Sequence, residues 1–222
     1  MTAAECSKLL AGVDRLPWDS ATLRRRTQQY GYRYDYQSRS VHPLPAAAIP
    51  AVLEPVIDRL LQLRVLTARP DQVIVNEYLP GQGIAAHVDQ PLVFADGIAS
   101  VTLGSPCVMS FRRHGEHHPQ YLAVGSAVAL RREARYSWTH EIAARKSDTW
   151  MGRVLPRSRR VSLTFRSMKS VQKQKEEEEE KEKTKEEEDE SSGTAVEAVV
   201  VPVPAALAVE ASASVVVTPG TQ

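Results

Sequence analysis

Apolar and polar positions alternate in short runs over the middle and second half of the chain. From Gln72 onward these runs are separated by Gly, Pro, Asp and Asn, which commonly end strands. Alternation with a period of two predicts strands that turn one face towards a core. The runs that fit are residues 72–79, 85–89, 98–103, 106–113, 119–124, 127–130, 135–143 and 160–166. Many short strands in series after one or two helices predict an antiparallel sandwich or jelly roll, so the expected fold class is mainly β with N-terminal helices (α+β).

The part of the chain before these strands has a helical pattern. Residues 51–64 place apolar side chains three and four positions apart, which is typical of an amphipathic helix, with Pro55 near its first turn. Residues 1–29 are expected to form a helical lead-in. Between the two, the tyrosines of the stretch Tyr30–Tyr36 occupy every second position and predict a strand with one aromatic face. With the neighbouring arginines, these rings either stack on nucleic-acid bases or pack the strand onto a core.

The formal charge of +1 hides an uneven distribution along the 222 residues. Residues 171–222 hold 5 Lys and 13 acidic residues, which leaves 23 basic and 14 acidic groups, a net +9, in residues 1–170. A Glu/Lys run without an apolar face, followed by low-complexity sequence, predicts a disordered acidic tail over residues 171–222. An alternative is that this tail folds back onto the basic domain. The expected domain is residues 30–170, and its charge favours a polyanionic partner such as nucleic acid.

Cysteine usage and hydropathy limit the class of protein. Cys6 and Cys107 are the only cysteines, which gives neither a disulfide framework nor a cysteine-rich metal site. The start of the chain lacks the pattern of a secretory signal, and no segment has the apolar length needed to span a bilayer. We therefore expect an intracellular protein of the cytoplasm or nucleus, monomeric by default and without a membrane partner.

The stretch NEYLPGQGIAAHVD, residues 76–89, ends in a pair of potential metal ligands. His87 and Asp89 are two positions apart, so on a strand they share a face. One imidazole and one carboxylate make two thirds of the facial triad that holds non-haem Fe(II). His140, in a strand-like segment about fifty residues later, is the natural third ligand. The remaining histidines are weaker candidates: His42, and His114, His117 and His118 of an expected exposed hairpin.

The last predicted strand places two cations on one face. Arg160, Ser162, Thr164 and Arg166 alternate with apolar residues. Two guanidiniums turned into a barrel are costly unless they meet an anion, and a dicarboxylate would satisfy them. A solvent-facing strand is the alternative reading of this segment.

Together these motifs resemble the AlkB family of Fe(II)- and 2-oxoglutarate-dependent dioxygenases. The resemblance runs from about residue 30 to 169 and rests on Asn76-x-Tyr78, Pro80-Gly81, His87-x-Asp89, His140 and Arg160-x5-Arg166. It implies a double-stranded β-helix core that uses Fe(II), 2-oxoglutarate and O2. It also implies Fe(II) on His87, Asp89 and His140. The residues implied for 2-oxoglutarate are Asn76, Tyr78, Arg160 and Arg166, with Arg160 on the distal carboxylate.

The substrate is left open between several classes. Family members that repair alkylated bases carry an acidic residue two positions after the metal aspartate, where this chain has Pro91. The sequence of the stretches PGQGIxxHxD and WTHEIxxRKxDT more closely resembles the branch that hydroxylates modified wobble uridines in tRNA. The leading expectation is oxidation of alkylated or modified bases in RNA or DNA, presented single-stranded or flipped. Oxidation of a protein side chain or small molecule by the same iron centre is the alternative, and a non-catalytic binding module is third.

Overall fold

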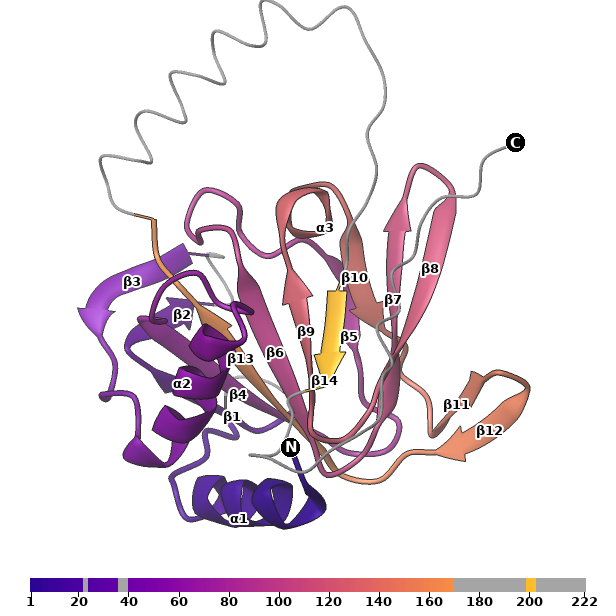
Figure 1. Cartoon of the computed structure of the whole chain (residues 1–222), viewed down its shortest axis with the longest axis horizontal. Coiled ribbons are helices and arrows are strands. Elements are labelled where there is room, and N and C mark those ends of the chain that lie inside the picture. Colours follow the sequence, from indigo (N-terminus) through magenta and orange to yellow (C-terminus); the bar gives the residue numbers. More distant parts are fainter. Residues whose placement is uncertain (22–23, 36–39, 170–198, 203–222) are drawn as a thin grey trace, which may run out of the picture.

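A computed structural model describes residues 1–21, 24–35, 40–169 and 199–202 of the chain. Two antiparallel sheets face each other, and helices α1 and α2 lie against the larger one (Figure 1). The six strands of the larger sheet are, in spatial order, β1 (Thr27–Tyr30), β4 (Gln72–Tyr78), β13 (Arg160–Arg166), β6 (Ile98–Leu103), β9 (Ser126–Leu130) and β14 (Val199–Pro202). The four of the smaller sheet are β5 (Ile84–His87), β10 (Thr139–Ile142), β7 (Cys107–Arg113) and β8 (Glu116–Leu122). This arrangement is a jelly roll, and it confirms the predicted fold class.

The helices and two hairpins complete the described part of the chain. Helix α1 (Ala3–Asp14) begins with a capping box in which Thr2 and Glu5 satisfy each other's backbone N–H groups. A 3-10 turn, η1 (Ala51–Leu53), leads into α2 (Glu54–Gln62), whose first turn accommodates Pro55 as predicted. A short helix, α3 (Arg132–Tyr136), precedes β10. The hairpins pair β2 (Tyr32–Asp35) with β3 (Ser40–Pro45), and β11 (Ser147–Trp150) with β12 (Arg153–Pro156).

The alternation of residues along β13 separates two hydrophobic cores. Val161, Leu163 and Phe165 are fully buried and pack with α1 and α2 on the outer face of the larger sheet. The second core lies between the two sheets and joins residues of β6 and β9 to residues of β7 and β10. The other residues of β13 therefore face the space between the sheets.

The predicted helical lead-in over residues 1–29 is wrong in its second half, because α1 ends at Asp14 and Thr27–Tyr30 pair with β4 as β1. Two further local predictions were wrong, and one hairpin was missed. The strand expected over residues 135–143 is shorter, because α3 occupies residues 132–136 and only Thr139–Ile142 pair as β10. The hairpin of β11 and β12 was not predicted. The continuous tyrosine strand is broken at Gly31, which has φ +76°, and a Cβ there would lie 1.8 Å from the carbonyl oxygen of Asp71. Tyr30 is buried in the helix-side core, so for this ring the packing alternative holds.

The acidic tail lies mostly outside the described residues. Within it the structure describes β14, which pairs with β9 at the edge of the larger sheet. Disorder of residues 171–198 and 203–222, and a fold-back of this segment, stay predictions. Among the described residues no helix has both the length and the apolar character to cross a membrane.

Candidate active site

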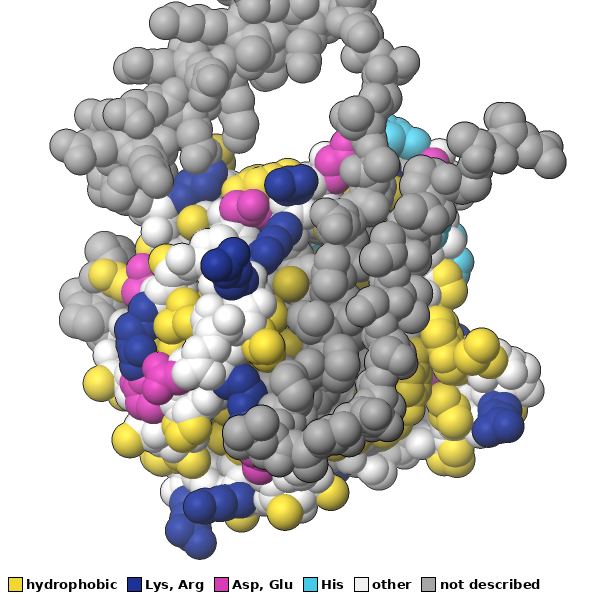
Figure 2. Space-filling model, viewed as in Figure 1, with side chains coloured by type: hydrophobic (Ala, Val, Ile, Leu, Met, Phe, Trp, Pro, Cys, Tyr) yellow, Lys and Arg dark blue, Asp and Glu magenta, His cyan; other side chains and the backbone are white. Residues whose placement is uncertain are grey.

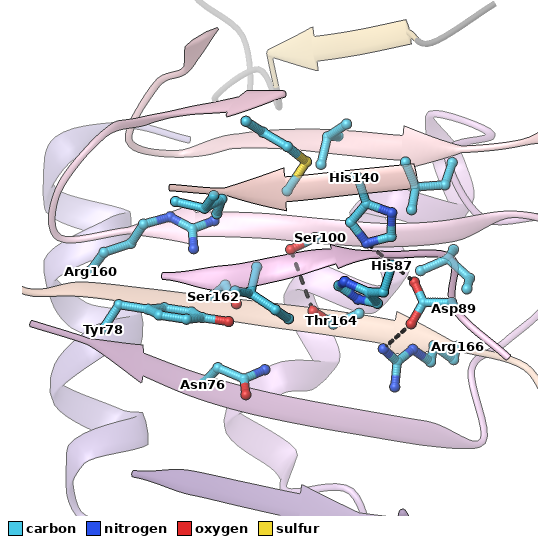
Figure 3. Close-up of a pocket in the computed structure, with 16 residues that line it drawn as sticks. Asn76, Tyr78, His87, Asp89, Ser100, His140, Arg160, Ser162, Thr164 and Arg166 are labelled. Atoms are coloured by element: carbon cyan, nitrogen blue, oxygen red, sulfur yellow. Dashed lines mark hydrogen bonds and ion pairs between the residues drawn. The ribbon is translucent and has the colours of Figure 1, made fainter. Parts of the chain in front are cut away.

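Three potential metal ligands meet at the junction of β5 and β10. His87 and His140 are cross-strand partners in the antiparallel register, and their ring centroids are 4.3 Å apart. Asp89 follows β5, and its Oδ2 lies 3.7 Å from His140 Nε2. One donor atom from each residue lies within 4.8 Å of the other two. The three side chains, distant in sequence, converge on one point (Figure 3).

The protonation states of this cluster suit a divalent metal ion. Burial alone would raise the pKa of Asp89, but the positive charge of Arg166 and its other cationic neighbours lowers that pKa to about 2. Burial lowers the pKa of His140 to about 4, although the charge of Asp89 opposes the shift. At neutral pH the site presents a carboxylate and a neutral imidazole, the forms that bind metal. Two imidazoles and a carboxylate fit the ligand set of non-haem Fe(II).

A pocket between the sheets extends from this cluster. It encloses about 520 Å³ of empty space, part of it open to solvent. The predicted polar face of β13 lines it with Arg160, Ser162, Thr164 and Arg166, so the solvent-facing alternative for this strand is wrong. Figure 3 shows the triad and Arg166 at one end of the pocket and Arg160 with Tyr78 at the other. A bound molecule reaching from the triad to Arg160 would therefore lie along β13.

The two arginines of β13 have different partners. Arg166 forms an ion pair with Asp89 Oδ1. Arg160 is only 4% exposed, donates from Nη2 to Thr102 Oγ1 at 3.0 Å, and has no acidic partner among the described residues. Its buried Nε also lacks a hydrogen-bond partner there. A buried guanidinium without a counter-charge is expensive, so the far end of the pocket fits a carboxylate such as one end of 2-oxoglutarate.

Asn76 and Tyr78 line the same pocket from β4, next to β13. Arg25 donates from Nε to Asn76 Oδ1 at 2.9 Å, and its guanidinium lies 5.5 Å from the centre of the Tyr78 ring. The sequence showed Arg25 only as one member of a basic run. Its position beside the pocket was missed, because it depends on β1 pairing with β4.

The weaker histidine candidates lie apart from the metal cluster. His114 is at the tip of the hairpin that joins β7 and β8, as predicted. His117 Nε2 contacts Ser110 Oγ at 3.0 Å, and the exposed ring of His118 lies 5.0 Å from that of Trp138. The side chain of His42 is outside the described residues.

One further residue near the triad was missed. Arg135 of α3 is 1% exposed, and its Nη1 donates to the carbonyl oxygen of Asp89 at 2.7 Å. Arg135 was predicted only as the first residue of a strand over residues 135–143. An arginine flanked by Ala134 and Tyr136 gave no signal of burial, because arginines are mostly exposed.

Residues 12–166 match the 2OG-Fe(II) oxygenase superfamily. An uncharacterized protein, L905, of Acanthamoeba polyphaga mimivirus is 33% identical over 172 residues, covering 76% of this chain and 81% of the viral protein. The mouse tRNA (carboxymethyluridine(34)-5-O)-methyltransferase ALKBH8 is 38% identical over 134 residues, covering 56% of this chain and 19% of the mouse protein. The alkylated DNA repair protein ALKBH8 homolog of Arabidopsis thaliana is 33% identical over 196 residues, covering 77% of this chain and 56% of the plant protein.

Among solved structures, a Pseudomonas putida prolyl-4-hydroxylase is similar with 16% identity and a TM-score of 0.48, covering 76% of this chain and 89% of that one. The chain spans only part of the ALKBH8 proteins, about a fifth of the mouse protein's length. The superfamily match covers most of the domain that contains the triad and the pocket. The chain therefore belongs to the 2OG-Fe(II) oxygenase superfamily, among its AlkB-like members, and is a dioxygenase that uses Fe(II), 2-oxoglutarate and O2.

Proposed function

We propose that this dioxygenase oxidises modified or alkylated bases in nucleic acid, with tRNA as the first substrate to test. The observation that carries the proposal is one pocket between the sheets, with a cluster of metal ligands at one end and, at the other, a buried guanidinium that has no acidic partner among the described residues. In this assignment His87, Asp89 and His140 hold Fe(II).

The remaining polar residues of the pocket would hold the co-substrate. Arg160 takes the distal carboxylate of 2-oxoglutarate, since a planar guanidinium matches a carboxylate with two parallel hydrogen bonds. Asn76, Tyr78 and Arg166 complete the binding residues. When bound, Fe(II), 2-oxoglutarate and O2 supply the oxidation of a substrate C–H bond, with succinate and CO2 as the co-products.

The protein's own residues position these groups and exclude water. Arg166 holds the Asp89 carboxylate in its charged form, ready to bind metal. Ile98, Val128 and Leu130 form an apolar wall of the pocket opposite the smaller sheet. This wall keeps the reacting groups in a dry environment, where electrostatic contacts are stronger than in water.

Two observations support a nucleic-acid substrate. Relatives are named for acting on tRNA, in the mouse protein, and on DNA N6-methyl adenine, in a Caenorhabditis elegans protein that is 22% identical. Residues 1–170 carry the excess of positive charge. Arg131 and Arg132 directly follow Leu130, which lines the pocket, in the sequence. Arg131 also donates a hydrogen bond to the carbonyl oxygen of Arg64. Figure 2 shows several Lys and Arg side chains near the upper end of one face, with acidic side chains among them.

The test is turnover of the purified, Fe(II)-loaded protein with 2-oxoglutarate. Total tRNA, methylated DNA and RNA oligonucleotides and a protein extract are offered separately, and mass spectrometry reads the loss of a methylene group or the gain of one oxygen atom. Oxidised bases in a nucleic-acid pool are the expected result. Oxidation confined to the protein extract would overturn the proposed substrate.

Variants test the residue assignments in the same assay. His87→Ala and Asp89→Ala should abolish succinate formation, because each removes a metal ligand. His117→Ala is the matched control, since this histidine contacts Ser110 on the exposed hairpin. Succinate formation retained in folded, metal-loaded His87→Ala protein would refute the assignment.

A further inference from the structure

Helix α3 carries a fully buried arginine whose hydrogen bonds all end on one loop. The Arg135 guanidinium donates from Nη1 to the carbonyl oxygen of Asp89 at 2.7 Å, and from Nη2 to those of Phe94 at 3.0 Å and Gln90 at 3.1 Å. Its Nε points to the carbonyl oxygen of Ala95 at 3.4 Å. The loop that follows β5, residues 89–95, therefore curves around a single side chain.

The acceptors make this arrangement unusual for a buried cation. All four are backbone carbonyls, and none of the described carboxylates forms a salt bridge with Arg135. The Asp89 carboxylate acts on Arg135 through space, without a salt bridge. Burying a guanidinium is costly, and an apolar side chain of similar volume commonly packs such a site with less penalty. The cost indicates a role beyond filling space in the core.

The far end of the loop is held by backbone hydrogen bonds and by the buried ring of Phe94, which packs in the core between the sheets. Ala95 N–H donates to Ser167 O at 2.9 Å, and Lys169 N–H donates to Val93 O at 2.9 Å. These bonds attach the far end of the loop to the chain after β13. At the near end, Arg166 pairs with the Asp89 side chain and the Arg135 guanidinium binds the Asp89 backbone carbonyl.

Arg135 also belongs to the segment that carries the third metal ligand. It lies in α3, which leads directly into β10 and His140. One side chain thus links the element that carries His140 to the loop that begins at Asp89. The pairing of β5 with β10 is a second connection between the elements that carry these ligands, whose side chains are 3.7 Å apart.

We infer that Arg135 is a positioning residue that fixes Asp89 and His140 in metal-binding geometry before metal arrives. This inference rests on the proposed metal site. Groups that orient metal ligands without touching the metal typically contribute 10- to 100-fold in metal affinity. A guanidinium suits the task because its five N–H donors form a rigid planar fork, whereas a lysine is a flexible point charge.

The experiment measures Co(II) binding to the metal-free protein by titration, without 2-oxoglutarate, and records the visible absorption of bound Co(II), which reports its coordination. We expect Arg135→Met to weaken Co(II) binding about 10- to 100-fold and to change the spectrum. Arg135→Lys keeps the charge but cannot reach all four carbonyls, so it should weaken binding about tenfold. It supplies the same test if the methionine variant fails to fold.

Arg157→Met is the matched control. The Arg157 side chain is also buried and has two carbonyl acceptors, Gln82 O and Ala143 O, but it forms an ion pair with Asp148 and makes no contact with the triad. It should lose stability and keep wild-type Co(II) affinity. Wild-type affinity in folded Arg135 variants, or an equal loss in Arg157→Met, would overturn the inference. If His87→Ala binds Co(II) as wild type does, the proposed metal site itself fails, which separates the two outcomes.

Discussion

Replacing Arg160 with methionine should weaken 2-oxoglutarate binding while sparing the fold. Arg160 is 4% exposed and has no acidic partner among the described residues, so a bound carboxylate would provide its counter-charge. Truncating one partner of a buried, hydrogen-bonded charge pair costs about 2–5 kcal/mol. Because the pocket is partly open, we expect the lower part of that range, about 2–4 kcal/mol, which corresponds to a roughly 30- to 1,000-fold higher Kd.

In contrast to 2-oxoglutarate binding, the stability of the protein should not fall when Arg160 is replaced with methionine. Without 2-oxoglutarate the buried guanidinium keeps its desolvation cost, relieved by one hydrogen bond to Thr102. The Arg160→Met protein should therefore unfold at the same or a higher urea concentration than wild type. Affinity is measured by calorimetric titration of 2-oxoglutarate into anaerobic, Mn(II)-loaded protein.

Arg112→Met is the control for this experiment. Arg112 is half-exposed and pairs with Glu141 across neighbouring strands β7 and β10, so its loss should leave the Kd unchanged. A Kd within threefold of wild type in folded Arg160→Met protein would refute the assignment of the distal carboxylate. Marked destabilisation of this variant would show that Arg160 is structural.

Three further predictions concern stability. Gly31→Ala should lower the free energy of unfolding, measured in urea, far more than Gly115→Ala. Both glycines have positive φ, which costs an alanine about 1 kcal/mol. Only at position 31 would the new Cβ overlap backbone, because it would lie 1.8 Å from the carbonyl oxygen of Asp71. Similar losses would contradict the packing. The pKa of Asp148 is lowered, because hydrogen bonds from Arg157 and the Val108 N–H outweigh the effect of burial. The contribution of Asp148 to the free energy of unfolding is therefore complete above its unfolded pKa of 3.8 and is lost as pH falls below that value. The stabilities of wild type and Asp148→Asn should differ at pH 6 and converge in acid. A difference that stays constant with pH would contradict this. Co(II) at 100 times its Kd should raise the free energy of unfolding of wild type by about 2.7 kcal/mol, and EDTA should reverse this effect. His87→Ala should not be stabilised. Equal stabilisation of both proteins would mean that the metal binds elsewhere.

Much of the pocket could be predicted from the period of two along strands. His87 with Asp89, and Arg160 with Arg166, were placed on shared faces, and the structure brings both pairs into one pocket. His140 needed more than periodicity, because its place opposite His87 depends on which strands pair. Its strand-like segment in the expected jelly roll made His140 the natural third ligand, and the family resemblance implied the same role.

The missed features depend on contacts between distant segments. Arg135 was assigned to a strand, since its neighbours alternate like one, but the segment turns as α3 to reach the loop after Asp89. Arg25 reaches Asn76 only because β1 pairs with β4. The β11–β12 hairpin is anchored at Asp148 by Arg145 and Arg157, a polar cluster without hydrophobic periodicity.

The central position of β13 makes the chain sensitive to changes in length. This strand lies between β4 and β6, so it is fixed on both sides by hydrogen bonds. Inserting or deleting one residue ahead of it would shift its register and turn both of its arginines towards the helices, while the apolar residues would face the pocket. During evolution the strand can therefore accept substitutions at single positions, but a one-codon gain or loss would remove both guanidiniums from the pocket at once.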